Sequence, residues 1–89
     1  MRSVIAQKLF VGGLAFSTSS ERLREVFAQA GVVKSAQVVM DHLTGRSRGF
    51  GFVEMATVEG AESAIKKFNG RELDGWTLRV EYAKPRSRW

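Results

Sequence analysis

Cysteine is absent from the 89-residue sequence, and histidine and proline each occur only once. Without cysteine the chain can form no disulfide bond, no thiolate metal site and no thiol nucleophile. The lone His42 has no second histidine or cysteine with which to share a metal ion, so we expect it to be a solvated loop residue. Neither a metal site nor a bound cofactor is expected.

Long hydrophobic runs are also lacking. Residues 1–7 offer only Val4, Ile5 and Ala6 as an apolar stretch, which is far too short for a signal peptide or a membrane span. We therefore expect no membrane partner. We expect an intracellular protein, with the cytoplasm as the default and the nucleus or an organelle as open alternatives.

The composition is that of one small folded domain, with 44% hydrophobic and 26% charged residues. Fourteen Lys and Arg outnumber nine Asp and Glu, for a net charge of +5, which favours polyanions weakly. The signs are segregated along the chain. Acids occur in the two segments with helical patterns, and bases gather at 46–48 and 84–88.

Four strand patterns and two helical patterns follow one another. Strands are expected at 8–14, 32–40, 49–55 and 76–83. A capping box at 18–21 predicts the start of a first helix, and Gly31 is expected as its left-handed C-cap. Thr57 is expected to cap a second helix, which the pair at 69–70 ends.

This order, βαββαβ, predicts an α+β domain. Two right-handed crossovers place both helices on one face of a four-stranded antiparallel sheet, the ferredoxin-like sandwich. The other face of the sheet is left open to solvent. We expect the domain to span 8–84 as a monomer, with 1–7 and 85–89 as flanking tails.

Side-chain alternation along the strands predicts which residues occupy the open face. Val11 and Val53 belong to the face under the helices, so Phe10, Phe50 and Phe52 point outward. The alternative register would bury the three rings, but it would also draw Arg48 inward and expose both valines. Charged residues flank the rings: Lys8, Arg48, Arg79 and Glu81. Aromatic rings beside cations are typical of surfaces that bind single-stranded nucleic acid.

Two segments resemble the ribonucleoprotein motifs of the RNA recognition motif family. They are L-F-V-G-G-L at 9–14 and R-G-F-G-F-V-E-M at 48–55. The second matches the family pattern except at its last position, where Met55 replaces an aromatic residue. The resemblance extends over 8–84 and implies a post-transcriptional protein that binds single-stranded RNA. Single-stranded DNA stays open as a partner, because stacking does not depend on the sugar.

The resemblance also implies a role for each position. Phe10 and Phe50 would each stack under a base, Phe52 would lie against sugars, and Arg48 would pair with a phosphate. Arg46 would help the loop between the second and third strands, at 41–48, to clasp the RNA strand. The residues implied to edge the platform and tune base choice are Gln37, Val39, Arg79, Glu81 and Lys84.

Three other functions fit the same fold less well. Acylphosphatase needs an arginine in the loop after the first strand and a positioned asparagine, but residues 13–17 hold no arginine and Asn69 ends a helix. Copper chaperones of this fold need cysteine. We therefore expect no enzyme. A protein-interaction module stays open, although such relatives typically have degraded platform aromatics and this chain keeps all three.

Overall fold

The computed structural model describes residues 7–83 of the chain. Lys84 and the tail at 85–89, like residues 1–6, lie outside this range. The elements are β1 (Lys8–Gly12), α1 (Ser20–Phe27), β2 (Val33–Met40), β3 (Ser47–Met55), α2 (Val58–Phe68), β4 (Glu72–Leu73), β5 (Trp76–Thr77) and β6 (Arg79–Tyr82).

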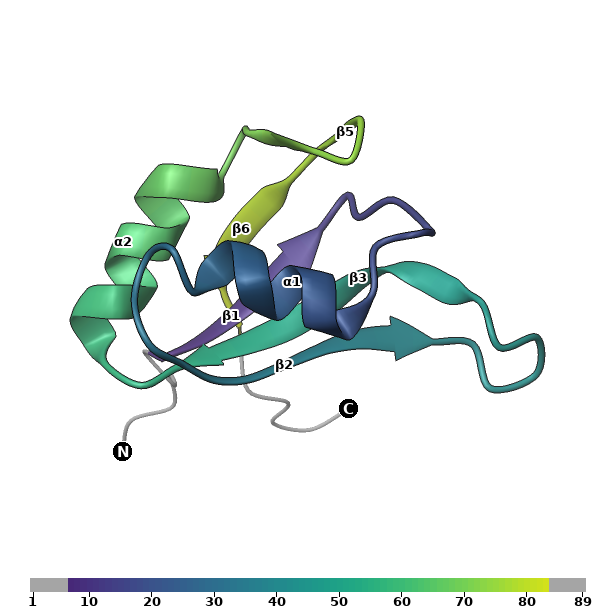
Figure 1. The fold of residues 1–89 in the computed structure, drawn as a ribbon, viewed down its shortest axis with the longest axis horizontal. Helices are drawn as coiled ribbons and strands as arrows, with labels where there is room; N and C mark the ends of the chain where they lie inside the picture. Colours follow the sequence, from purple (N-terminus) through teal and green to yellow (C-terminus); the bar gives the residue numbers. More distant parts are fainter. Residues whose placement is uncertain (1–6, 84–89) are drawn as a thin grey trace.

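The main sheet has four antiparallel strands in the order β2-β3-β1-β6. Both helices lie on one face of this sheet (Figure 1), which confirms the predicted α+β ferredoxin-like sandwich. The loop between β2 and β3 extends beyond the end of the sheet (Figure 1). The opposite face carries no helix among the described residues.

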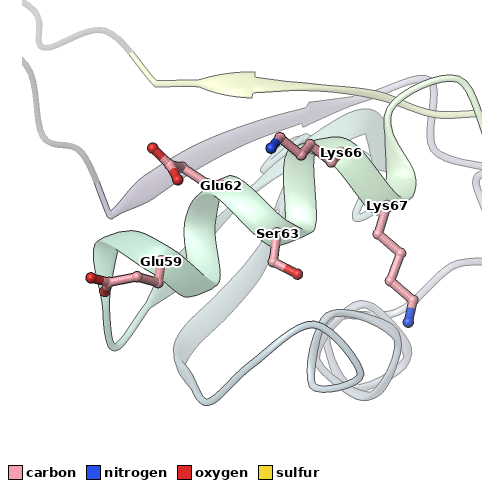
Figure 2. A pocket seen from close by; sticks show the side chains of 5 residues that line it. All are labelled: Glu59, Glu62, Ser63, Lys66 and Lys67. Carbon is pink, nitrogen blue, oxygen red and sulfur yellow. The ribbon is translucent and has the colours of Figure 1, made fainter.

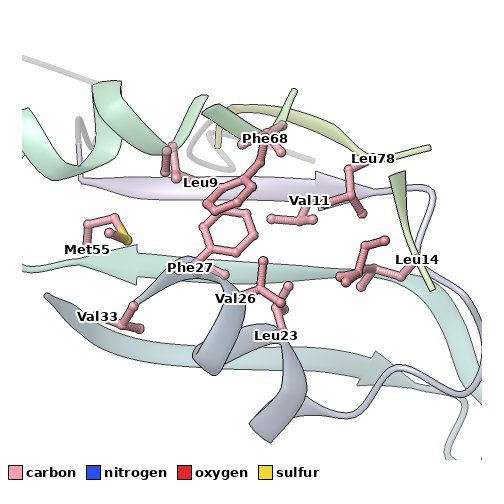
Figure 3. Close-up of a cluster of buried hydrophobic side chains, with 14 of the residues drawn as sticks. Leu9, Val11, Leu14, Leu23, Val26, Phe27, Val33, Met55, Phe68 and Leu78 are labelled. Atoms are coloured by element: carbon pink, nitrogen blue, oxygen red, sulfur yellow. The ribbon is translucent and has the colours of Figure 1, made fainter. Parts of the chain in front are cut away.

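The hydrophobic core fills the space between the helices and the sheet (Figure 3). Leu9, Val11 and Val53 supply the sheet side and are fully buried. Phe27 of α1 and Phe68 of α2 meet across the core, with ring centroids 4.8 Å apart. The predicted inward face of β1 and β3 is therefore confirmed.

The fourth predicted strand, at 76–83, is divided in the structure. Residues Trp76 and Thr77 form β5, which pairs with β4 in a separate two-stranded hairpin, and only β6 joins the main sheet. The cause is the turn at Asp74 and Gly75, whose φ angles of 53° and 88° suit a tight hairpin. Trp76 is consequently 58% exposed and is not packed into the core.

The predicted start and end of α1 need correction. Ser19, one residue after the predicted Thr18, caps the helix, and its hydroxyl accepts a hydrogen bond from the Arg22 N–H at 3.0 Å. The third helical residue is then Arg22 in place of Glu21, so the predicted capping box is replaced by a simple serine cap. Gly31 is not left-handed; the helix ends at Phe27 with Ala28 in helical conformation. A Cβ on Gly31 would lie 3.2 Å from the Cα atom of Gly60, so close packing against α2 accounts for this glycine.

The predicted boundaries of α2 are confirmed. The Thr57 hydroxyl accepts a hydrogen bond from the Gly60 N–H at 2.9 Å. Asn69 is the C-cap residue, and Gly70 follows with a φ of 85°, a left-handed conformation that a glycine adopts without strain.

A polar contact fastens the β4–β5 turn to the start of α1. The buried Thr18 hydroxyl donates a hydrogen bond to Asp74 Oδ2 at 2.7 Å, and the Arg22 guanidinium donates to Oδ1 at 3.2 Å. The hydrogen bond from Thr18, followed by that from Arg22, lowers the pKa of Asp74 from its usual value of 3.8. The charged carboxylate therefore favours the folded state.

This contact predicts a specific dependence of stability on pH. A depressed folded pKa contributes stability above the unfolded pKa, near 3.8, and loses it as the pH falls through the folded value. Asp74→Asn keeps a residue that tolerates a positive φ but removes the charge. Thermal unfolding between pH 7 and pH 2.5 should show a lower melting temperature for the variant at pH 7 and a difference that shrinks below pH 4. A difference that stays constant over this range would contradict the assignment.

Candidate functional site

The open face of the sheet is ordered in rows of cross-strand neighbours, whose side chains project to the same side. One row crosses all four strands, because Phe52 pairs with both Gln37 and Phe10, and Phe10 pairs with Glu81. The row therefore has a carboxamide at one end, two phenyl rings in the middle and a carboxylate at the other end.

The next row toward the β2–β3 loop contains the third ring. Phe50 pairs with Gly12, and Gly12 pairs in turn with Arg79. The Phe10 and Phe50 ring centroids are 5.8 Å apart, those of Phe10 and Phe52 are 5.9 Å apart, and those of Phe50 and Phe52 are 6.2 Å apart. These are ordinary aromatic contact distances, so the three half-buried rings form one continuous patch, the aromatic platform.

Gly12 leaves room for the central ring of the platform. A Cβ atom at this position would lie 2.9 Å from Phe10 Cε2 and 3.1 Å from Phe10 Cζ. The Phe10 ring thus lies over the backbone of its own strand, where a side chain at Gly12 would otherwise stand. The glycine is required here by space, because its φ angle is not positive.

The charges around the platform are arranged close to the rings. The Lys8 ammonium lies 5.3 Å from the centroid of the Phe52 ring. At the β6 edge, Arg79 Nε lies 4.0 Å from Glu81 Oε2, a long ion pair between two exposed side chains. The described site residues that the sheet brings together on this face are Lys8, Phe10, Gln37, Phe50, Phe52, Arg79 and Glu81.

The three remaining described site residues, Val39, Arg46 and Arg48, lie outside the regular pairing of the sheet. Val38 pairs with Gly51 and Met40 pairs with Ser47, so β2 advances two residues while β3 advances four. Arg48 lies in this bulge and is exposed, but strand alternation does not determine its direction there. Arg46 is exposed in the loop, whose ends are joined by a hydrogen bond of 2.7 Å from the Asp41 N–H to the Arg46 carbonyl.

Two exposed features were not predicted from the sequence. Phe16, in the loop after β1, is 74% exposed, and its Cε1 atom lies 3.7 Å from the position of a Cβ on Gly49. The one signal for it in the sequence was an aromatic residue that stands outside the periodic patterns of the strands and helices. The second feature is a hollow of about 280 Å³ beside the platform, lined by Phe10, Phe52, Glu81, Tyr82 and Ala83.

A larger hollow, of about 440 Å³, lies on the outer side of α2 (Figure 2). Its lining residues are Glu59, Glu62, Ser63, Lys66 and Lys67. These side chains carry both signs of charge and include no aromatic ring that could hold a ligand by stacking. The hollow is on the opposite side of the domain from the aromatic platform, so it contributes nothing to that surface.

Within residues 7–83 no group of three or more His, Cys, Asp or Glu side chains is placed to hold a metal ion. None of the helices described is both long and apolar enough to cross a membrane.

Sequence comparison matches residues 9–79 to the family described as RNA recognition motif. The small RNA-binding protein 11, chloroplastic, of Arabidopsis thaliana is 48% identical over 83 residues, which cover 93% of this chain and 57% of that protein. The 29 kDa ribonucleoprotein A, chloroplastic, of Nicotiana sylvestris is 54% identical, with 88% and 29% covered. The glycine-rich RNA-binding protein 3, mitochondrial, of Arabidopsis thaliana is 45% identical, with 98% and 28% covered.

The chain thus spans 57% or less of the length of these three relatives. Their names place them in chloroplasts or mitochondria, which does not support the cytoplasmic default expected from the sequence.

Two solved structures resemble the fold closely. The crystal structure of RNA-binding protein PG1 has a TM-score of 0.85 and 40% identity, with 92% of this chain and 99% of that chain covered. The RRM of Rna15 with bound RNA (GU) has a TM-score of 0.79 and 26% identity, with 86% and 82% covered.

The close approach of Phe10 to Gly12 leads to a prediction about the platform. Gly12→Ala should displace the Phe10 ring, because the new methyl group would lie 2.9 Å from Cε2. NMR should show altered ring-current shifts for Phe10 and Phe50, while the fold is retained. In a Phe10→Ala background the same change should alter the Phe50 signals little. Unchanged Phe10 and Phe50 signals in the single variant would show that the ring does not lie over Gly12.

Proposed function

This chain belongs to the RNA recognition motif family, and we propose that it binds single-stranded RNA across the open face of its sheet. The observation that carries the proposal is the aromatic platform: three mutually contacting rings on a face that no described helix covers. Exposed rings offer flat surfaces to unpaired bases, and each stacked base contributes about 1–3 kcal/mol.

In the proposed complex Phe10 and Phe50 each stack under one base, and Phe52 lies against the sugars between them. The 5.8 Å separation of the Phe10 and Phe50 centroids supports this, because adjacent rings can hold successive nucleotides of one strand. A base pair in a duplex hides the faces that this arrangement needs. The proposed role of the chain is therefore to bind RNA and not to catalyse a reaction.

We propose that the basic residues around the platform contact phosphates. Lys8 beside Phe52 and Arg79 beside Gly12 flank the rings directly, while Arg46 and Arg48 extend the positive charge toward the β2–β3 loop. Lys84, outside the described residues, is proposed to add to the β6 side. Gln37, Val39 and Glu81 complete the proposed edge, where side chains of differing chemistry can read bases.

The proposed binding unit is the monomeric domain at 8–84, flanked by 1–7 and 85–89. Relatives that carry chloroplastic and mitochondrial names favour an organelle as its location and organellar RNA as its partner. Single-stranded DNA is a weaker proposed partner, because the platform has the same stacking surface for either sugar.

The salt dependence of binding tests the phosphate contacts. If the basic residues neutralise about three or four phosphates, the logarithm of the association constant should fall against the logarithm of salt concentration with a slope of about −2 to −3. Arg79→Gln should make this slope shallower by about 0.7. Lys67→Gln, an equal charge change on the outer side of α2, should leave it unchanged. A wild-type slope near zero would rule out the phosphate contacts.

A pair of substitutions on β3 tests the stacking face. Phe50→Ala should weaken RNA binding by about 1–3 kcal/mol, since a base loses its stacking partner. Val53→Ala should instead lower the free energy of unfolding by about 1–3 kcal/mol through a core cavity, because Val53 is fully buried. Binding titrations and thermal unfolding of both variants provide the two measurements.

Each variant should mainly change one of the two measured quantities, RNA affinity or stability, so each serves as the control for the other. Folded Val53→Ala protein should bind RNA with nearly wild-type affinity, and Phe50→Ala should melt closer to wild type than Val53→Ala does. If Phe50→Ala binds RNA as tightly as wild type, the platform is not the binding surface and the proposed function fails.

A further inference from the structure

The hollow at the β1–β6 side of the open face lies beside a ring and a carboxylate. Phe10 and Glu81 are direct cross-strand partners, and both line the hollow together with Phe52, Tyr82 and Ala83. A base stacked on the Phe10 ring would therefore present one edge to the Glu81 carboxylate, because the neighbouring strand lies only about 5 Å away.

Among the described residues, none makes a hydrogen bond to the Glu81 carboxylate, so it can accept hydrogen bonds from such an edge. A carboxylate carries only acceptors, on two oxygens. Within residues 7–83 its one ion pair is with Arg79, at 4.0 Å, which is too long for a hydrogen bond and leaves both oxygens open. The Glu81 side chain is 54% exposed, so a ligand can reach it.

A negative charge at the edge of a surface for a polyanion is unfavourable for every RNA sequence unless the bound base compensates for it. Compensation requires N–H donors aimed at the carboxylate, and two adjacent donors match its two oxygens best. Lys8 and Arg79, which lie on either side of the Phe10–Glu81 row, offset the repulsion of the phosphates but do not distinguish bases.

The four bases differ in what their pairing edges offer. Guanine has two adjacent donors, N1–H and the N2 amino group. Adenine and cytosine each pair one amino group with a ring nitrogen acceptor, which repels a carboxylate. Uracil has one N–H between two carbonyl oxygens. Resting on the proposed function, we propose that this hollow selects guanine and that Glu81 is the residue that determines the preference.

The experiment uses the full chain and single-stranded RNA in which one position varies. The probes are oligouridine octamers whose fourth nucleotide is guanosine, adenosine, cytidine or uridine, with inosine and 1-methylguanosine as analogues. Guanosine should bind about five- to a hundredfold more tightly than uridine, the range expected for one bidentate contact. Inosine, which lacks the N2 amino group, should fall between them, and 1-methylguanosine, which lacks N1–H, should lose most of the gain.

Two matched variants assign the preference to one residue. Glu81→Gln keeps the size of the side chain but leaves a single acceptor oxygen, so the guanosine preference should fall to about threefold or less. Its affinity for the uridine octamer should not fall, because a negative charge has been removed. Glu54→Gln makes the same change on the same face, beside Lys8 and 3.8 Å from Lys34 but outside the hollow, and should retain the preference.

The outcomes separate this inference from the proposed function. Equal binding of all four octamers, or a preference for another base, overturns the selection of guanine while leaving RNA binding intact. A guanosine preference that survives in Glu81→Gln, or that disappears equally in Glu54→Gln, overturns the role of Glu81. If the folded protein binds none of the octamers, the proposed function itself fails.

Discussion

The antiparallel pairing of β1 with β3 is the constraint on which the rest of the structure depends. Leu9 lies opposite Val53 and Val11 opposite Gly51 on the core side, and this register sets Phe10 opposite Phe52 on the other side. Because side chains alternate with a period of two, a slip of one residue would exchange the two sets completely. The same register therefore buries the aliphatic residues and exposes the rings.

The glycines of the two motifs leave the space that the Phe10 ring and the neighbouring strand β2 occupy. Gly12 leaves the space in which the Phe10 ring lies. A Cβ on Gly51 would lie 2.5 Å from the Gln37 carbonyl oxygen, so this glycine permits the close approach of β2. The same residues that define the resemblance to the family therefore also shape the platform and bring Gln37 to its row.

Most of the fold and most of the site could be predicted from local patterns. Alternation placed Phe10, Phe50 and Phe52 on one face of the sheet and Val11 and Val53 on the other, as the pairing and burial of these strands show. The division of the last strand was missed because residues 76–83 alternate without a break, while the turn that redirects Trp76 involves Asp74 and Gly75, before the apolar pattern begins.

The sequence by itself determined the order of the elements, the identity of the inward and outward faces and the chemistry of the platform, because these follow from periods of two and 3.6 residues along the chain. Only the tertiary structure decided which side chains become neighbours across strands. The row from Gln37 through the rings to Glu81, the hollow beside it and the contact of Thr18 with Asp74 join segments far apart in the chain. Their distances depend on the register between strands that are far apart in the chain, which no local pattern contains.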